Sequence, residues 1–335
     1  MMIIRPLDNQ QQLAEFINRQ PLQPFLQSWA WGDFQESIGR PIWRLGVFEG
    51  DALVGCALVV EHELMLGKTY LYCPRGPLAA TPEALTMLLE EIKKLGRTSN
   101  AMYVKADLGL YTFSFDVDGF VEGYIQGTTL QPRQTLVIDT SRTSDEILAG
   151  VHQKTRYNIR LAEKKNVVVR WGSSDKDVQE FLRLMHITAK RQSIRLHSDQ
   201  YYQKLFSFMH RAGMAEFAIG EVDGQAHVAH MVFWHGQTAT YLHGGSDDAR
   251  KEMMIPYLVQ WRTIQRAHEK GVHDYDLWGI APDNASEHKW AGVTRFKRGF
   301  NGREVVFPPA LNAVLQPQWY HTYRLAKRFR GGVDA

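Results

Sequence analysis

Basic side chains recur along one segment of the chain at a spacing that suits phosphate binding. Arg156, Arg160 and Lys164 are four residues apart, so on a helix they share one face. Lys154 and Lys165 add two more cations to the same segment. A cation stripe of this kind fits an RNA backbone, whose recognition is largely electrostatic. A solvated helix face without a ligand is the alternative that the sequence leaves open.

Two further basic segments lie nearer the C-terminus. One is RFKRGFNGR at 295–303, which contains Lys297. The other holds Arg324, Lys327, Arg328 and Arg330. This second cluster could contact anionic lipid head groups or RNA, or nothing at all. The whole chain has 39 Lys and Arg against 36 Asp and Glu, a net charge of +3, so the positive charge is mild and locally concentrated.

Metal ligands and reactive cysteines are poorly represented. His227 and His230 are expected on opposite faces of a strand, and we interpret them as core or edge histidines. Cys56 and Cys73 are too few for a disulfide scaffold or a cysteine zinc site, so both are predicted to be buried thiols. We therefore predict no metal site.

Length and composition indicate the class of fold that must position these side chains. The 335 residues are 44% hydrophobic and 22% charged, which excludes a disordered chain and suggests two domains. The N-terminus shows no signal peptide, and no window approaches 18 uninterrupted apolar residues. A cytoplasmic protein is expected.

The same order of elements is predicted twice. The first half shows a hairpin at 40–63, a strand at 69–74, a helix at 81–96 that ends at Gly96, and a strand at 101–107. The second half shows a hairpin at 214–236, a strand at 238–245, a helix at 254–271 and a strand at 272–280. Tyr103 and Tyr275 mark corresponding points about 172 residues apart, a repeat far too long for a solenoid. The repeat therefore predicts a duplicated domain.

Further helices precede the second hairpin. They are predicted at 144–165, 177–192 and 198–213, with a strand at 166–171. A hairpin followed by strand, helix and strand is typical of the GCN5-related N-acyltransferase (GNAT) fold. We expect an α+β protein of two tandem GNAT-like domains with an interdomain cleft and no coiled-coil arm. Residues 1–141 with 308–335 are expected to form the first domain, and residues 142–307 the second.

Coenzyme A is disfavoured as the acyl carrier. GNAT enzymes hold its pyrophosphate on backbone N–H groups at a helix N-terminus, reached through a glycine-rich turn. At that place the second half has SDDARKEMMIPY, where Asp247 and Asp248 would repel a pyrophosphate. The first half has YCPRGPLAATPEA, with a single glycine. Neither half offers a convincing cradle.

Two GNAT-like units without this loop resemble the Fem family of peptidoglycan bridge-forming aminoacyltransferases, in particular its compact FemX-type members. The resemblance covers nearly the whole chain and depends on the order of several stretches. They are QSWAWGDFQ (27–35), YCPRGPL (72–78), LQPRQTLVIDTS (130–141), HQKTRYNIRLAEKKNVVVRWG (152–172), YLHGGSDDARKEMMIPYLVQW (241–261), YDLWGI (275–280) and RFKRGFNGR (295–303).

The resemblance implies a reaction. An aminoacyl group passes from a tRNA ester to an amine on the stem peptide of a UDP-linked or lipid-linked peptidoglycan precursor. This is ester aminolysis through an oxyanionic intermediate, so orientation and oxyanion stabilisation are the main needs. A metal, a catalytic triad and an organic cofactor are all dispensable, and no cofactor is expected.

The resemblance also implies catalytic residues. Lys297 matches a lysine that stabilises the oxyanion or the leaving ribose, and the backbone carbonyl of Phe296 would orient the incoming amine. A basic surface strand is the alternative interpretation of this segment. Asp107 matches an acidic position that faces the substrate, although an Asp at a strand end is often a turn residue. Lys105 is expected on the same face of its strand, in contact with a phosphate or exposed.

Precursor binding is expected at a second set of positions. The family's two cations that hold a UDP pyrophosphate align with Gln35 and His197, and Arg195 is a substitute for the latter. His243 stands where a tyrosine is expected. These departures favour a lipid-linked precursor or a different muropeptide. Tyr201, Tyr257 and Trp31 complete the candidate substrate-binding residues, with core packing as their alternative.

The remaining expectations concern partners. Lys154, Arg156, Arg160 and Lys164 are the candidates for tRNA binding. A peripheral contact with the inner face of the membrane and a monomeric state are expected. The segment from about residue 308 is expected to return to the first domain. Two other functions stay open: an N-acyltransferase that uses acyl-CoA or acyl-carrier protein, and a non-catalytic member that binds precursor or RNA.

Overall fold

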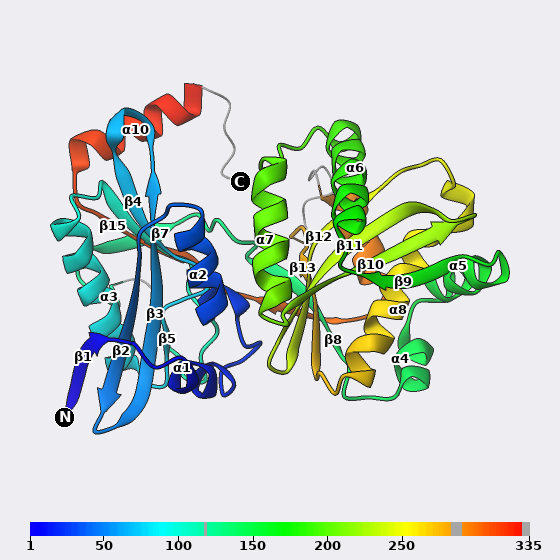
Figure 1. The fold of residues 1–335 in the computed structure, drawn as a ribbon. Coiled ribbons are helices and arrows are strands. Elements are labelled where there is room, and N and C mark those ends of the chain that lie inside the picture. Colours follow the sequence, from blue (N-terminus) through cyan, green and yellow to red (C-terminus); the bar gives the residue numbers. More distant parts are fainter. Residues whose placement is uncertain (117–118, 283–289, 330–335) are drawn as a thin grey trace. The chain divides into compact units, whose positions relative to one another are not determined.

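The computed structural model describes residues 1–116, 119–282 and 290–329, with side chains through residue 326 in the last helix (Figure 1). Arg330, from the basic C-terminal cluster, lies outside the described residues, as do the side chains of Lys327 and Arg328. The chain forms two compact units: unit 1 is residues 1–133 with residues from 306 onward, and unit 2 is residues 134–305.

Unit 1 is built on a mixed sheet with the strand order β1-β2-β3-β4-β6-β15-β7, to which β5 adds by pairing with β3. The strands are β1 (Met2–Pro6), β2 (Ile42–Glu49), β3 (Ala52–Glu63), β4 (Thr69–Cys73), β5 (Leu78–Ala79), β6 (Tyr103–Ala106), β7 (Tyr124–Gly127) and β15 (Ala310–Val314). The helices are α1 (Gln10–Ile17), α2 (Trp29–Ser37), α3 (Pro82–Thr98) and α10 (Pro317–Phe329). β15 pairs with both β6 and β7, so the return of the C-terminal segment to unit 1 is confirmed.

Helix α3 covers the unit 1 sheet because its apolar residues recur on one face. Leu85, Leu88 and Ile92 are fully buried against the strands. Thr81 caps the helix through its side chain, and Pro82 is its first residue. The predicted end at Gly96 is wrong. The helix continues to Thr98, and Gly96 is packed where a Cβ atom would lie 2.6 Å from Leu315 Cδ1.

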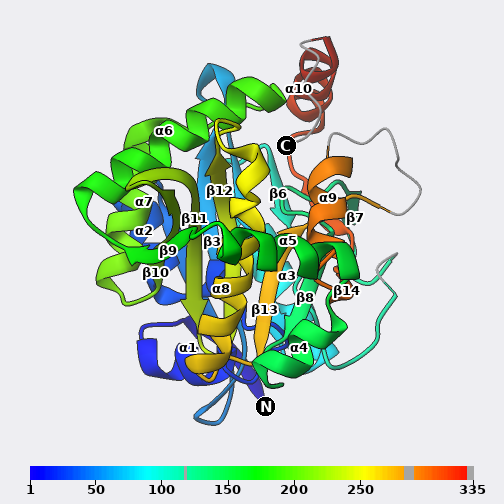
Figure 2. The same ribbon diagram turned by 90° about the vertical axis from the view of Figure 1, so that its right-hand side faces the viewer.

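Unit 2 has a mixed sheet in the order β14-β8-β13-β12-β11-β10-β9. The strands are β8 (Gln134–Asp139), β9 (Val168–Gly172), β10 (Ala215–Val222), β11 (Gln225–His235), β12 (Thr238–Ser246), β13 (Asp274–Gly279) and β14 (Arg303–Val306). The helices are α4 (Ser144–Gly150), α5 (Gln153–Lys164), α6 (Asp175–Gln192), α7 (Asp199–Arg211), α8 (Ile255–Glu269) and α9 (Ala291–Arg298). α6 and α7 pack on one face of the sheet and α5 packs on α8 over the other (Figure 2).

The boundary between the units differs from the predicted one. β8 pairs in antiparallel register with β13, which places residues 134–141 in unit 2 and not in the first domain. The first boundary therefore follows Arg133, and the second follows Val305, two residues before the predicted position. The sequence pattern of residues 134–141 predicts a strand but does not indicate which of the two sheets that strand joins, so the boundary could not be predicted from it.

Two local predictions are corrected. The helix expected at 144–165 is two helices, α4 and α5, since Val151 takes an extended conformation between them. The alternation of Trp29 and Trp31 in the sequence predicts a shared strand face, but both residues lie on helix α2, where positions two apart do not share a face. The expected absence of a coiled-coil arm holds for the described part of unit 2, where short helices α6 and α7 occupy that region. None of the helices described here combines the length and hydropathy needed to cross a bilayer.

Candidate active site

Lys297 lies in the last turn of α9, and its side chain is buried in unit 2. Its ammonium group donates a hydrogen bond to the carbonyl oxygen of Gly279 over 2.7 Å. The same nitrogen lies 5.8 Å from the ring centroid of Tyr241 on β12. For Lys297, the interpretation as part of a basic surface strand is therefore wrong, because this residue is buried and lies on a helix. Burial of a charged ammonium costs free energy, even when one backbone carbonyl accepts a hydrogen bond from it.

A bulge in β13 lies next to Gly279, the hydrogen-bond partner of Lys297. The pairing of β13 with β8 shifts register between Asp276 and Gly279, and Trp278 takes a left-handed conformation with φ 64°. The buried carboxylate of Asp276 stabilises this bulge, because it accepts the backbone N–H of Trp278 over 2.7 Å and the hydroxyl of Thr135. The irregular backbone thus lies directly before the carbonyl that Lys297 uses.

Burial and a nearby carboxylate set the charge of Lys297. Burial lowers the pKa of Lys297 to about 8, and the negative charge of Asp276 partly opposes this shift. The side chain is therefore mostly an ammonium at neutral pH and loses its proton in mildly alkaline solution. An ammonium in such surroundings can stabilise a developing negative charge.

Two residues that the sequence analysis missed lie beside Lys297. The ring of Tyr241 lies 4.2 Å from the ring of His230 on β11. Burial and the charge of Lys297 lower the pKa of His230 to about 3, so its imidazole is neutral. Its Nδ1 atom has no hydrogen-bond partner among the described residues. Gly244 leaves room for the tyrosine, because a Cβ there would lie 2.2 Å from Tyr241 Oη.

The sequence contained a signal for only one of these two residues. Tyr241 lies two positions before His243, where the family alignment already expected a tyrosine. A bulge at Leu242 in the β11–β12 pairing changes the local register, which an alignment by spacing cannot detect. His230 carried no signal, because a histidine on an apolar strand is indistinguishable from a core residue.

Phe296 places an aromatic ring and a carbonyl next to Lys297. Its ring contacts that of Tyr257, in the first turn of α8, at 5.1 Å between centroids. Its carbonyl oxygen accepts the N–H of Gly299 over 3.2 Å, which leaves its second lone pair for another donor. Gly299 itself lies against α5, since a Cβ there would come 2.4 Å from Thr155 Oγ1.

Most of the predicted substrate-binding residues of unit 2 lie in one aromatic cluster. His197 stacks on Tyr201 at 4.2 Å between centroids, and Tyr202 contacts His243 at 5.2 Å. Tyr202 joins the two parts and was not predicted. Arg195 is exposed on the connection between α6 and α7.

Asp107 is the centre of a buried polar cluster in unit 1. Its Oδ2 atom accepts hydrogen bonds from the Tyr72 hydroxyl and from the backbone N–H groups of Leu130 and Gln131, each at 2.8 Å. Burial raises the pKa of Asp107, although these donors act in the opposite direction. Lys105, two residues earlier on β6, is also buried and donates to the carbonyl of Thr128. Of the two alternatives for Lys105, contact with a phosphate or exposure to solvent, exposure is therefore wrong.

The two predicted residues of α2 are buried in unit 1. Trp31 packs against Phe25 and Phe34, with ring centroids 5.6 Å and 5.4 Å away. Gln35 accepts a hydrogen bond from Arg40 over 2.7 Å. The glutamine that replaces an expected cation thus has an arginine as its neighbour.

The cation stripe on α5 divides into exposed and engaged side chains. Lys154, Arg160 and Lys164 are exposed. Arg156 instead donates to the carbonyls of Ala149, at 2.9 Å, and Val151. These are carbonyls at the end of α4, so Arg156 has a structural function there.

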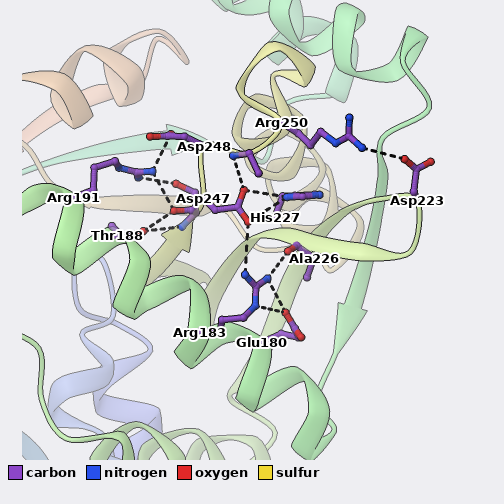
Figure 3. Close-up of polar contacts among 12 residues, drawn as sticks. Glu180, Arg183, Thr188, Arg191, Asp223, Ala226, His227, Asp247, Asp248 and Arg250 are labelled. Carbon is purple, nitrogen blue, oxygen red and sulfur yellow. Dashed lines mark hydrogen bonds and ion pairs between the residues drawn. The ribbon is translucent and has the colours of Figure 1, made fainter.

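The connection between β12 and α8 is held by ion pairs where GNAT enzymes bind a pyrophosphate (Figure 3). His227 Nδ1 lies 3.0 Å from a carboxylate oxygen of Asp247, and Arg183 Nη1 lies 3.7 Å from the other. Arg191 pairs with Asp248 at 2.9 Å. His227 therefore has Asp247 as a carboxylate partner.

The expectations about the burial of the cysteines and of these two histidines hold in the described part of the chain. Cys56 and Cys73 are buried free thiols, as predicted. His227 and His230 are both buried. Groups of His, Cys, Asp and Glu that could hold a metal ion are absent from residues 1–116, 119–282 and 290–329.

Comparisons with known proteins agree with this architecture. A lipid II:glycine glycyltransferase of Staphylococcus aureus is 26% identical over 366 aligned residues, which cover 84% of this chain and 86% of the relative. A crystal structure of FemX superposes with a TM-score of 0.82 at 18% identity and covers 96% of this chain and 99% of that one. A tandem GNAT protein from the clavulanic acid pathway superposes with a TM-score of 0.56 at 14% identity, over 93% of this chain and 98% of that one.

The predicted fold, an α+β protein of two tandem GNAT-like units, is thereby confirmed. The model of the FemAB family matches three segments, residues 9–122, 108–231 and 210–328, which together span most of the sequence. The chain belongs to the FemAB family.

Proposed function

We propose that this protein is an aminoacyltransferase that moves an amino acid from aminoacyl-tRNA to the stem peptide of a peptidoglycan precursor. Family membership and relatives named as lipid II:glycine glycyltransferases support this function. The observation that carries it is the buried ammonium of Lys297, which donates to the Gly279 carbonyl and lies near the ring of Tyr241. Such a group serves a reaction in which negative charge develops on an oxygen.

The reaction is the aminolysis of an activated ester. The amine of the stem peptide attacks the ester carbonyl, a C–N bond forms, and the carbonyl oxygen becomes an oxyanion that the Lys297 ammonium stabilises. The C–O bond to the ribose then breaks, and the departing ribose oxygen takes up the proton that the amine loses. The second lone pair of the Phe296 carbonyl orients the amine before attack.

Asp107 of unit 1 is proposed separately to bind a hydrogen-bond donor of the acceptor substrate. Its Oδ2 is occupied by three donors, which hold the carboxyl group in place. Its Oδ1 is buried without a hydrogen-bond partner in the part of the chain that the structure describes. A fixed carboxyl oxygen with an open position can accept a hydrogen bond from an ammonium or amine. Lys105 supports the same strand by its bond to Thr128.

Precursor recognition is assigned to the aromatic cluster and its neighbours. His197, Tyr201, His243 and Tyr257 supply ring faces for sugars or the peptide, and exposed Arg195 supplies a cation. Trp31 and Gln35 are buried in unit 1, so they hold neighbouring residues in place and do not contact the precursor directly. We assign a lipid-linked acceptor, because the curated relatives are named as lipid II:glycine glycyltransferases.

The donor and the setting complete the proposal. Exposed Lys154, Arg160 and Lys164 contact the tRNA backbone. The protein acts as a monomer in the cytoplasm, at the inner face of the membrane where a lipid-linked acceptor is present. Acyl-CoA is the poorer donor, because Asp247 and Asp248 occupy the pyrophosphate position within a network of ion pairs. A pyrophosphate there would meet two carboxylates.

The test is a transfer assay resolved by mass. The purified chain is incubated with a pool of charged tRNAs and either UDP-muropentapeptide or its lipid-linked form. We expect a mass increase of one amino-acid residue on the lipid-linked acceptor, and the increment identifies the amino acid. A Lys297→Met variant that transfers equally well, or a wild-type protein that modifies neither acceptor, would refute the proposal.

A further inference from the structure

Exposed apolar side chains gather at one end of unit 1, on two segments far apart in sequence. Met65 and Leu66 form the turn between β3 and β4, with exposed fractions of 54% and 80%. Trp319 and Leu325 on α10 are 44% and 55% exposed. Figures 1 and 2 show the β3–β4 turn and α10 at the same end of the unit. Such a group on a protein surface marks an interaction site.

Lys68 joins the two segments. Its ammonium donates to the side-chain oxygen of Gln316 over 3.0 Å and lies 4.6 Å from the ring centroid of Trp319. Gln316 in turn donates to the carbonyl of Asn100 over 2.9 Å. The start of α10 is thus fixed to the turn and to the end of α3.

The inner face of α10 is packed on the sheet. Tyr320 contacts Tyr103 at 5.3 Å between ring centroids, and Tyr103 stacks on Tyr70 at 4.9 Å. Tyr323 lies against the same cluster. The helix is therefore a docked element with a defined outer face, and its exposed residues have a fixed position relative to the turn.

The turn itself contains an unusual residue. Leu66 has φ 60° and ψ 33°, and Gly67 follows with φ 65°, while the Lys68 N–H donates to the Met65 carbonyl. Both central residues are left-handed, as in a type I′ turn, where Asn-Gly is preferred. The left-handed conformation is sterically unfavourable for leucine, and here it also leaves the Leu66 side chain exposed to water. The sequence thus places an apolar residue where a polar one would be more stable.

The sequence of helix α10 is basic. The sequence from 317 to 329 contains Arg324, Lys327 and Arg328 and no Asp or Glu. Lys68 adds a cation at the turn, and Glu63 at the end of β3 is the carboxylate nearest to it in sequence. Apolar side chains at the tip, an exposed tryptophan and a basic helix are the combination that binds the interface of an anionic bilayer.

We propose that the β3–β4 turn and the outer face of α10 form a membrane-docking face, which inserts Met65 and Leu66 into an anionic lipid surface. The proposed function supplies the reason, since a lipid-linked acceptor is reached from that surface. The docking itself depends only on the residues above and can be measured without either substrate.

The experiment is co-sedimentation of the full chain with vesicles of phosphatidylcholine, with and without phosphatidylglycerol. We expect binding to the anionic vesicles and much less to the neutral ones. Leu66→Asn keeps a favourable turn residue and should lower the partition about tenfold, since one apolar side chain no longer inserts. Arg324→Glu should lower it about fivefold. Ile3→Asn and Arg19→Glu, at exposed positions elsewhere in unit 1, are the matched controls and should bind as the wild type does.

Three outcomes would overturn the inference. They are equal binding of Leu66→Asn and wild type, equal losses in the control variants, and a loss of self-association in Leu66→Asn with unchanged vesicle binding, which would assign the face to a second copy of the chain. Transfer assays separate this inference from the function. Leu66→Asn should lose transfer to a lipid-linked acceptor in vesicles and retain transfer to a soluble UDP-linked acceptor if the wild type accepts one. A wild type that binds vesicles but transfers nothing would refute the function alone.

Discussion

The Lys297 ammonium and the Gly279 carbonyl oxygen are 2.7 Å apart, although 18 residues of chain separate them. The bond joins the last turn of α9 to the bulged end of β13. It satisfies one of the three protons of the ammonium, so the remaining protons are available to a substrate oxygen. This hydrogen bond underlies the predictions below, both for the activity of the site and for the stability of the protein.

Replacement of Lys297 by methionine should separate activity from stability. The variant should lose about 100-fold or more in kcat, because the donor to the oxyanion is gone. Circular dichroism and a thermal melt should show a folded protein. A variant that retains most of its turnover would remove Lys297 from the mechanism.

The same substitution should change how stability depends on pH. The folded-state pKa of Lys297, about 8, lies below its ordinary value of 10.5, so burial destabilises the protonated form. Lys297→Met should therefore be more stable than wild type at pH 7, by about 3 kcal/mol at most. Between pH 8 and 10.5 the unfolded chain binds the extra proton, so the wild type gains stability with pH and the gap closes. Urea unfolding of both proteins across this range measures it, and a constant gap would contradict the prediction.

Asp276→Asn should shift the pH profile of the reaction. Asp276 raises the pKa of Lys297, so loss of its charge should lower that pKa further. The single-turnover rate of wild type should decline above pH 8, and that of the variant should decline from a lower pH. The amide can still accept the Trp278 N–H, which limits damage to the bulge. Superimposable profiles would show that Asp276 has no electrostatic effect on the site.

Two glycines of the α9 region provide a matched pair. Gly299→Ala should destabilise the protein by about 1–3 kcal/mol, because its Cβ would lie 2.4 Å from Thr155 Oγ1. Gly292→Ala meets nothing within 4 Å and should be neutral or slightly stabilising. Thr155→Ala should recover part of the loss in the double variant. Chemical denaturation measures all four proteins, and equal effects of the two alanines would disprove the packing argument.

The exposed cations of α5 should contribute to RNA binding. The double variant Arg160→Glu/Lys164→Glu should bind tRNA more weakly and with a smaller dependence of log Kd on log salt, by about two charges. Lys204→Glu, an exposed lysine on α7, is the control for net charge. Filter binding over a salt series gives both slopes, and an unchanged slope in the double variant would favour a solvated helix face.

The sequence predicted the repeated order of elements well, because strand alternation and helix caps are local signals. Thr81 and Pro82 marked the start of α3, and the Thr143–Glu146 pair formed the capping box of α4. Trp29 and Trp31 misled for a related reason. Two aromatic residues at alternate positions fit a strand, yet they lie in a helix whose N-cap is Ser28.

The site was predictable only where one residue type carried it. Lys297 and Asp107 were named because they match positions in the family's motifs, and their functional roles are still predictions. Gly279, Asp276 and Tyr241 contribute through backbone geometry and contacts between strands, and no local pattern encodes these. The burial of Lys105 was missed because a lysine on a strand is usually exposed, and its carbonyl partner lies 23 residues away.

The pairing of β15 with β6 and β7 has a consequence for synthesis on the ribosome. Unit 2 is continuous, so all strands of its sheet are available once residue 306 has been translated. The sheet of unit 1 lacks a strand between β6 and β7 until residues 310–314 emerge. The nascent chain should therefore complete its second unit before its first, and the unpaired edges of β6 and β7 are the surfaces for which a chaperone would be needed in the interval.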